Sequence, residues 1–275
     1  MLTQEDINNG FLVYVHSGVD ATRDGFSFTV QDGGENGVQP AAGTFTFIFP
    51  HSGDAVVQLA LDEGSGTVAE DVSGLGNDGT LANGAVFEAD SGDGSAFSVR
   101  FDGIDDRIDL GPVDVYGSGL TLATWFKADS FPGQSNDPRL ISKASGLDAD
   151  AHVLMLSTTL SDDSTIRLRA RVRVAGTTET LIASSGDLLT GVWYHAVATY
   201  DGAMLRLYLD GVEVGSVPLS GAVDIEPLMP LAVGGQPAGA GERYFDGLLD
   251  DVRILQRALS ASEIAALITS IPTRK

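Results

Sequence analysis

The chain has 275 residues, 43% of them hydrophobic, with 34 glycines and no cysteine. This length allows one large β-domain or two smaller ones, with enough apolar residues for a hydrophobic core. The absence of cysteine excludes disulfides and thiolate metal sites. The sequence contains no apolar run of about 18 residues, which a membrane-spanning helix would need. Because 38 acidic residues outnumber 16 basic ones, the net charge of −22 disfavours nucleic acid, whose phosphates such a surface repels.

The first fifty residues have the alternation of short strands. FLVYVH (11–16), DGFSFTVQDGG (24–34) and GTFTFIFP (43–50) each place apolar residues at every second position, the period of a half-buried strand. A segment of about fifty residues is marginal as an independent domain. We therefore predict a small partial β-repeat over residues 1–50, with the boundary in HSGD (51–54).

The rest of the chain reads as many short strands with almost no helix. A hairpin is predicted over 204–217 with its turn at Asp210-Gly211, and Ser260 and Glu263 form a capping box for a short helix through Ile268. The spacing predicts an all-β fold, a two-sheet antiparallel sandwich or jelly roll, over residues 54–270 with one short C-terminal helix. The predicted strands cover 55–61, 97–101, 107–110, 120–127, 139–143, 152–158, 165–174, 192–200, 231–234 and 245–255.

Acidic residues gather near both ends of this sandwich. The loop DVSGLGNDG (71–79) carries Asp71 and Asn77 among three glycines, Asp62 precedes it, and the paired Asp250 and Asp251 lie on the last strand. Oxygen atoms of this kind are what calcium prefers. The alternative is that Gly, Asn and Asp act here as turn formers. We favour turn chemistry over metal binding for the acidic stretch 101–109, and a solvated loop over a rim site for 146–152.

A row of arginines interrupts this acidic chain. In TIRLRARVRV (165–174) the alternation puts four arginines on one face of a strand and the apolar residues on the other. Guanidinium groups match carboxylates and sulfates bidentately, so an acidic polysaccharide could lie along the row. The alternative is pairing with acidic neighbours in the same protein. The candidate ligand-binding residues are Arg167, Arg169, Arg171 and Arg173.

Several blocks resemble known families. Residues 2–18, 24–34 and 43–49 resemble the C-terminal half of the cadherin-like, chondroitin-sulfate-proteoglycan-type repeats of large bacterial surface proteins. The blocks LDEGSGTVAEDVSGLGNDGTL (61–81), FSVRFDGIDDRIDLG (97–111), LTLATWFKA (120–128), GVWYHAVATYDGAMLRLYLDGVEVG (191–215) and FDGLLDDVRILQRALSASEIAAL (245–267) resemble, in this order, the concanavalin A-like, laminin-G-like jelly-roll family.

The second resemblance implies a structural calcium that ties the first loop to the last strand. Carried onto this sequence, the implied calcium ligands are Asp62, Asp71, Asn77, Asp250 and Asp251. The resemblance makes His195 a framework position, and Trp125 and Trp193 read as core residues, with stacking on a sugar as the alternative.

No catalytic constellation accompanies the fold. The motifs E-x-D-x-x-E, Gln-x-His, G-x-S-x-G and H-E-x-x-H, which serve hydrolases and lyases, do not occur in the sequence. We therefore expect a non-enzyme: a calcium-dependent adhesion module that binds a glycan or glycoprotein, is monomeric, and belongs to a secreted or surface-anchored bacterial protein. Any export signal is expected outside this chain. The alternatives are a structural spacer domain and an accessory binding module of a polysaccharide-degrading enzyme.

Overall fold

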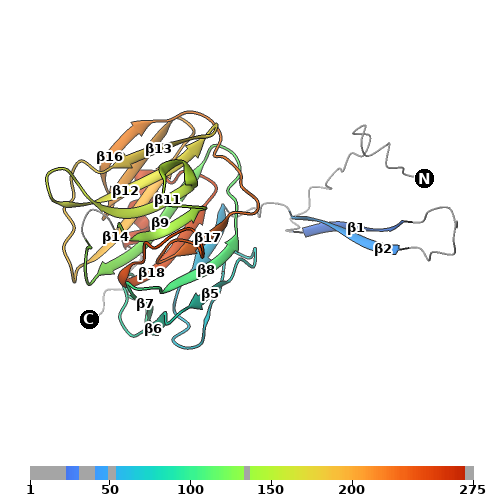
Figure 1. The fold of residues 1–275 in the computed structure, drawn as a ribbon, viewed down its shortest axis with the longest axis horizontal. Helices are drawn as coiled ribbons and strands as arrows, with labels where there is room; N and C mark the ends of the chain where they lie inside the picture. The colour runs from blue at the N-terminus through green and yellow to red at the C-terminus, as the bar shows by residue number, and fades with distance from the viewer. Residues whose placement is uncertain (1–22, 31–40, 49–53, 133–136, 270–275) are drawn as a thin grey trace. The chain divides into compact units, whose positions relative to one another are not determined.

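A computed structural model describes residues 23–30, 41–48, 54–132 and 137–269 (Figure 1). The chain divides into two compact units, Met1–Ser52 and Gly53–Lys275. In the first unit, β1 (Arg23–Val30) and β2 (Ala41–Ile48) form a two-stranded antiparallel sheet in which Phe26 lies opposite Phe45. The strand predicted over 11–16 lies outside the described residues, and the boundary at 51–54 stays a prediction.

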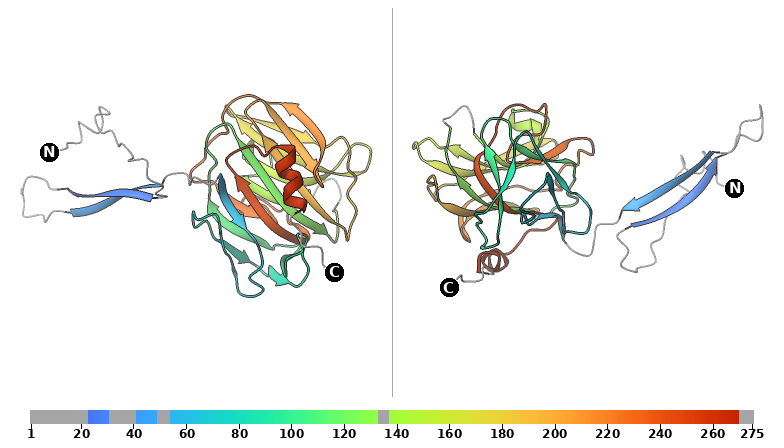
Figure 2. Two further views of the ribbon diagram at one scale, coloured as in Figure 1. Left: turned by 180° about the vertical axis from the view of Figure 1, so that it is seen from behind. Right: turned by 90° about the horizontal axis from the view of Figure 1, so that it is seen from below.

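The second unit is a sandwich of two antiparallel sheets (Figures 1 and 2). Sheet 1 contains, in spatial order, β13 (Thr177–Ile182), β12 (Ile166–Val174), β11 (His152–Leu160), β10 (Arg139–Ala144), β17 (Pro230–Val233), β8 (Arg107–Pro112), β5 (Gly79–Ala82) and β4 (Val68–Ala69). Sheet 2 contains β16 (Val212–Pro218), β15 (Met204–Leu209), β14 (Trp193–Tyr200), β9 (Leu120–Ala128), β18 (Asp246–Leu255), β7 (Ser98–Asp102) and β6 (Val86–Glu88), with β3 (Ala55–Leu59) also paired to β18. The predicted fold class is confirmed.

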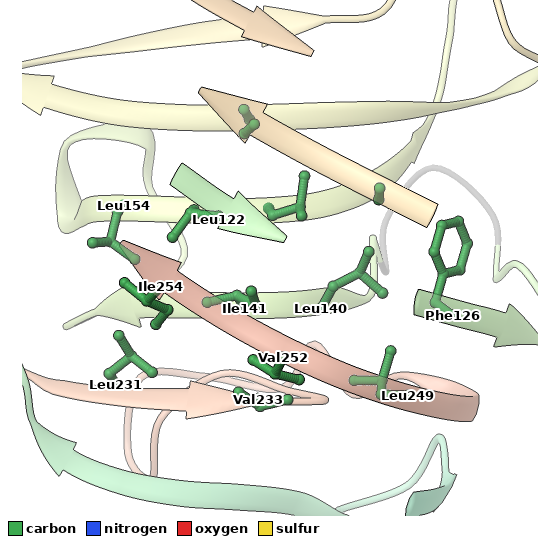
Figure 3. Close-up of a cluster of buried hydrophobic side chains, with 14 of the residues drawn as sticks. Leu122, Phe126, Leu140, Ile141, Leu154, Leu231, Val233, Leu249, Val252 and Ile254 are labelled. Carbon is green, nitrogen blue, oxygen red and sulfur yellow. The ribbon is translucent and has the colours of Figure 1, made fainter. Parts of the chain in front are cut away.

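The core lies between the sheets and follows the strand alternation. In β12, Leu168, Ala170 and Val172 are fully buried in the main hydrophobic cluster, so the arginines between them face away from it. Figure 3 shows part of this cluster, with side chains from both sheets in contact. The labelled residues are Leu122, Phe126, Leu140, Ile141, Leu154, Leu231, Val233, Leu249, Val252 and Ile254.

The helix α2 (Ala261–Thr269) covers the other face of sheet 2 (Figure 2). Ile264 packs there against Ala123, Val197 and Tyr208 in a second, smaller cluster. The predicted capping box is confirmed: the Ser260 backbone N–H donates to a Glu263 carboxylate oxygen at 2.8 Å, and the Glu263 N–H donates to the Ser260 hydroxyl at 3.3 Å. No helix among the described residues combines the length and hydropathy that crossing a bilayer requires.

Two backbone features of sheet 2 agree with the sequence. The turn between β15 and β16 has positive φ at both Asp210 (48°) and Gly211 (80°), as a two-residue hairpin turn requires. The pairing of β18 with β9 shifts register between Asp250 and Arg253, and Asp251 has φ of 43°. Because of this irregularity, the side chains of the consecutive residues Asp250 and Asp251 do not follow the usual alternation between the two faces of the sheet.

Candidate functional site: an acidic seam and an arginine cluster

Asp71 organises the loop between β4 and β5. One oxygen of its carboxylate accepts from the backbone N–H groups of Gln58 (2.9 Å) and Ser73 (3.0 Å), and the other accepts from the Ser73 hydroxyl (2.7 Å) and the Asn77 N–H (2.9 Å). Four donors use the acceptor positions of a carboxylate. Asp71 therefore ties the loop to β3, which is the turn-forming role considered as the alternative to metal binding.

Asn77 acts beside Asp71 in the same loop. Its side-chain amide donates to the Val56 carbonyl at 2.8 Å, and the neighbouring Asp78 carboxylate accepts from the Asp71 N–H at 2.8 Å. These bonds fix the loop to the start of β3. The Asn77 side-chain oxygen is the ligand atom that this residue could offer to a cation.

Asp62, Asp250 and Asp251 gather instead around a second loop, which contains Asp93. One oxygen of Asp250 accepts from the N–H groups of Gly92 (2.9 Å) and Asp93 (3.4 Å), while Asp62 accepts from those of Ala96 and Phe97, both at 3.0 Å. We call Asp62, Asp93, Asp250 and Asp251 the acidic seam. The sequence analysis missed Asp93, because nothing in the sequence around it indicates that its loop lies beside β18.

Two carboxyl groups of the seam, those of Asp250 and Asp251, are buried. Burial, followed by the nearby Asp93 carboxylate, raises the pKa of Asp250 to about 8, and burial also raises the pKa of Asp251. Asp250 is fully buried, and Arg253 lies beside Asp251 with a guanidinium–carboxylate distance of 2.9 Å. One arginine thus faces several carboxylates.

The donor set of the seam fits a hard cation. Carboxylate oxygens with backbone carbonyls from a Gly- and Ser-rich loop are the ligands calcium takes, and a bound divalent ion would compensate the buried charge. Hydrogen bonding divides the five predicted ligands into Asp71 with Asn77 and the three aspartates of the seam. Calcium binding by these residues stays a prediction.

A tighter acidic group lies at the β7–β8 turn. Among the described residues, Asp102, Asp105 and Asp106 have carboxylate oxygens within 4.8 Å of one another. The Asp102 carboxylate accepts from the Ile104 and Asp105 N–H groups at 2.8 and 3.4 Å, and Asp106 accepts from the Asp102 N–H at 3.0 Å. These bonds close the turn, which is the turn chemistry expected from the sequence.

The arginine row on β12 is divided by its partners. At one end Arg167 pairs with Asp163 (3.0 Å) and Asp187 (2.9 Å), and at the other Arg173 pairs with Asp224 and Glu226. The two ends are therefore neutralised within the protein, as the alternative interpretation held.

The centre of the row is different. Arg169 pairs with Asp137 at 2.9 Å, whereas Arg171 forms no ion pair with a described residue. Arg139 of β10, absent from the predicted set, lies on the same row, because Ser157 of β11 is opposite Arg139 on one side and Arg169 on the other. We call Arg139, Arg169 and Arg171 the arginine cluster.

Comparisons with known proteins agree with this architecture. A family model described as the concanavalin A-like lectin/glucanases superfamily matches residues 102–265, more than half of the chain. The chain belongs to this superfamily. A cadherin-like family model matches residues 1–48, so both resemblances seen in the sequence are confirmed.

A curated relative of this concanavalin A-like chain is an adhesion receptor. The adhesion G-protein coupled receptor V1 of Danio rerio is 26% identical over 154 residues, which are 54% of this chain and 2% of that receptor. The chain thus spans a very small part of the relative's length.

Solved structures share the fold at low identity. Domain 4 of AbnA, a GH43 extracellular arabinanase from Geobacillus stearothermophilus, solved with arabinotriose, has 17% identity and a TM-score of 0.60, covering 79% of this chain and 99% of that one. The binding domain of Paraclostridial Mosquitocidal Protein 1 has 18% identity and a TM-score of 0.60 (79% and 52%). A Trypanosoma rangeli sialidase has 19% identity and a TM-score of 0.54 (80% and 34%). The neighbours therefore include both binding domains and glycosidases.

Aromatic and histidine side chains of this concanavalin A-like domain occupy framework positions. Trp125 is 6% exposed, and its ring centroid lies 5.0 Å from that of buried His195. Trp193 is half-buried and its indole N–H donates to Asp90 at 3.1 Å, with the Lys127 ammonium 5.4 Å from its ring centroid. Trp125 is therefore a core residue, and Lys127 lies over one face of Trp193.

Proposed function

We propose that residues 53–275 form a non-catalytic carbohydrate-binding module that serves adhesion in an extracellular, secreted or surface-anchored protein. The observation that carries the proposal is the arginine cluster. Arg139 is 2% exposed and its Nε has no hydrogen-bond partner among the described residues, and the same holds for Nη2 of Arg169, which is 6% exposed. A buried N–H donor without a hydrogen-bond acceptor costs free energy of folding. A site that keeps two such donors is therefore suited to a ligand that supplies the acceptors.

The comparisons support the same class of ligand. Domain 4 of AbnA was solved with arabinotriose, and the mosquitocidal protein's match is its binding domain. The zebrafish relative is an adhesion receptor, and the cadherin-like match over residues 1–48 fits an extracellular setting. Fold does not fix function by itself, which is why the proposal rests on the cluster.

Calcium is the second part of the proposal. The acidic seam would hold the ion through Asp62, Asp250 and Asp251, with Asp93 added to the predicted ligands. Bound there, calcium would neutralise buried carboxylates and fix the loop over residues 90–97 to β18 and the end of β3. Its role would be structural, so glycan binding would depend on it through the stability of the domain.

A glycan array with purified chain tests this function. We expect binding to at least one glycan class in millimolar calcium and weaker binding after chelation with EDTA. An array without signal for any glycan in saturating calcium would contradict the binding function and favour a spacer domain.

A further inference from the structure

Positive charge is concentrated around Arg139. Its guanidinium is close enough to those of Arg169, Arg171 and Arg243 for each to lower its pKa, while the Asp137 carboxylate raises it. Burial is the larger cause, and together they bring the pKa of Arg139 to about 9. Arg139 is therefore still protonated at neutral pH, in a protein whose net charge is −22.

The register explains why these side chains converge. Arg139, Ser157 and Arg169 lie opposite one another on three neighbouring strands, so the two arginines are about 10 Å apart at their backbones, two strand spacings. The Arg169 Nε donates to the Ser157 hydroxyl at 3.2 Å, which leans its guanidinium toward β10. Arg171 is in the adjacent row, opposite Met155.

Some guanidinium N–H donors of the arginine cluster have no acceptor among the described residues. Asp137 receives Arg169 Nη1 at 2.9 Å on its carboxylate and Arg139 Nη1 at 2.9 Å on its backbone carbonyl. Within the described residues, Nε of Arg139 and Nη2 of Arg169 have no acceptor. The carboxylate and the backbone carbonyl of Asp137 thus accept from other arginine nitrogens, and neither accepts from these two N–H groups.

His152 does not satisfy Arg171. The Nε2 atom of His152 lies 3.2 Å from the side-chain nitrogen of Gln236, which donates, so the ring proton belongs on Nδ1, where the Asp148 carbonyl accepts it at 2.8 Å. The Arg171 Nη1 atom lies 3.2 Å from that same Nδ1. Two N–H groups then face each other, and Arg171 also keeps a donor without an acceptor there.

We propose that the arginine cluster receives the carboxylate of an acidic sugar, a uronic or sialic acid residue at or near the end of a glycan. This rests on the proposed carbohydrate-binding function and names its ligand class. The free donors come from three arginines, and one carboxylate has two oxygens with about four acceptor positions. Charge-assisted and bidentate bonds of this kind are the strong ones.

A carboxylate fits better than a sulfate ester. Arg139 and Arg169 are nearly fully buried, so the anionic group must enter as a small planar unit. A sulfate brings three oxygens and would bury at least one without a donor, which costs free energy. The cluster reaches the surface at half-buried Arg171 and at Asp137, whose side chain is 17% exposed, so the sugar ring would lie on that side.

Binding to free acids and their methyl esters tests the inference. Oligogalacturonate, a hyaluronan fragment and sialyllactose are titrated calorimetrically into the full chain in calcium, each beside its methyl ester. We expect at least one free acid to bind at least about 30-fold more tightly than its ester, a difference that corresponds to about 2 kcal/mol. Equal affinities for acid and ester, or a sulfated oligosaccharide bound more tightly than every carboxylated one, would overturn it.

Variants assign the effect to the cluster. Arg139→Met and Arg169→Met are each expected to weaken binding of the free acid about 30-fold while leaving ester binding unchanged. Arg206→Met removes the same charge from sheet 2, where Arg206 pairs with Asp201 at 2.6 Å, and is expected to bind like the parent chain. If the two cluster variants and the control bind alike, the cluster is not the site.

One readout needs no variant to fold. In the unmodified chain, ¹⁵N-detected arginine Nε–H resonances of Arg139 and Arg169 should shift on adding the free acid and stay in place on adding the ester. Shifts elsewhere with none at these two groups would contradict the inference. Tight binding of neutral glycans alone would refute the carboxylate and preserve the proposed function, whereas binding of no glycan refutes both.

Discussion

His195 is a buried residue whose protonation the fold resists. It is 1% exposed, neither ring nitrogen has a partner among the described residues, and burial followed by the Arg253 charge lowers its pKa to about 4. Because the unfolded chain takes up the proton near pH 6.5, the protein loses stability as the pH falls from about 6.5 toward 4. Above about pH 6.5 the ring is neutral in both the folded and the unfolded chain, so it adds no further pH dependence to the free energy of unfolding.

We predict that His195→Phe removes this part of the pH dependence. The free energy of unfolding of the variant should improve relative to the parent chain by about 2 kcal/mol between pH 7.5 and pH 4.5, since one pKa unit corresponds to about 1.4 kcal/mol. Urea unfolding over this range measures it. Parallel stability curves for the two proteins would show that His195 does not titrate as described.

Single-residue reasoning reached the arginine row but not Arg139, which lies beside its centre. Alternation within 165–174 places four arginines on one face, and the structure agrees. Nothing local to Arg139 tells the reader that Ser157 lies between it and Arg169, because that depends on pairing between strands distant in the chain. Likewise the acidic loop of Asp71 was recognisable, while the hydrogen bonds that occupy its carboxylate were not.

At the scale of elements, β18 is the strand on which the sandwich depends. It pairs with β9, β7 and β3, and its Gly247 has φ of 145° with no room for a side chain. A Cβ built there would lie 2.2 Å from the Lys127 carbonyl oxygen. Both the backbone conformation and this contact require glycine.

Gly247→Ala is therefore expected to destabilise the domain by more than about 3 kcal/mol, because the neighbouring strand must move as well as the turned backbone. Gly117→Ala is the matched control: φ is 92° and nothing lies within 4 Å of its added Cβ, so the cost should be about 1 kcal/mol, that of backbone strain alone. Chemical denaturation of both variants measures the difference. Equal losses would mean that the β9 contact has no effect.

Elements with a clear hydrophobic periodicity or capping motif could be predicted from the sequence, whereas short or polar strands could not. The hairpin over 204–217 and the capped helix appear where the pattern placed them. The short strands β4, β5 and β6, and β13 with its sequence TTETLI, were missed. They are short or polar, and they form because neighbouring strands of the sheets supply their hydrogen bonds, a tertiary effect that local propensity does not carry.

At the scale of the whole molecule, the acidic seam joins segments far apart in the chain. Asp62 follows β3, Asp93 lies between β6 and β7, and the other two aspartates are on β18, so a cation held there would link the two ends of the sandwich. Binding to the folded state alone stabilises it by mass action, by about 2.7 kcal/mol at a free ion concentration of 100 times Kd.

We accordingly predict that removing calcium with EDTA lowers the Tm by about 5–10 °C, given roughly 2–4 °C per kcal/mol for a domain of this size. Asp250→Asn should abolish the response to calcium, because it removes the fully buried carboxylate of the seam. Asp105→Asn, at an exposed residue of the turn group that also contains Asp102 and Asp106, should keep it. Differential scanning calorimetry with and without the ion distinguishes the two variants. A response lost in Asp105→Asn and kept in Asp250→Asn would move the ion to the β7–β8 turn, and no response in the parent chain would remove calcium from the proposed function.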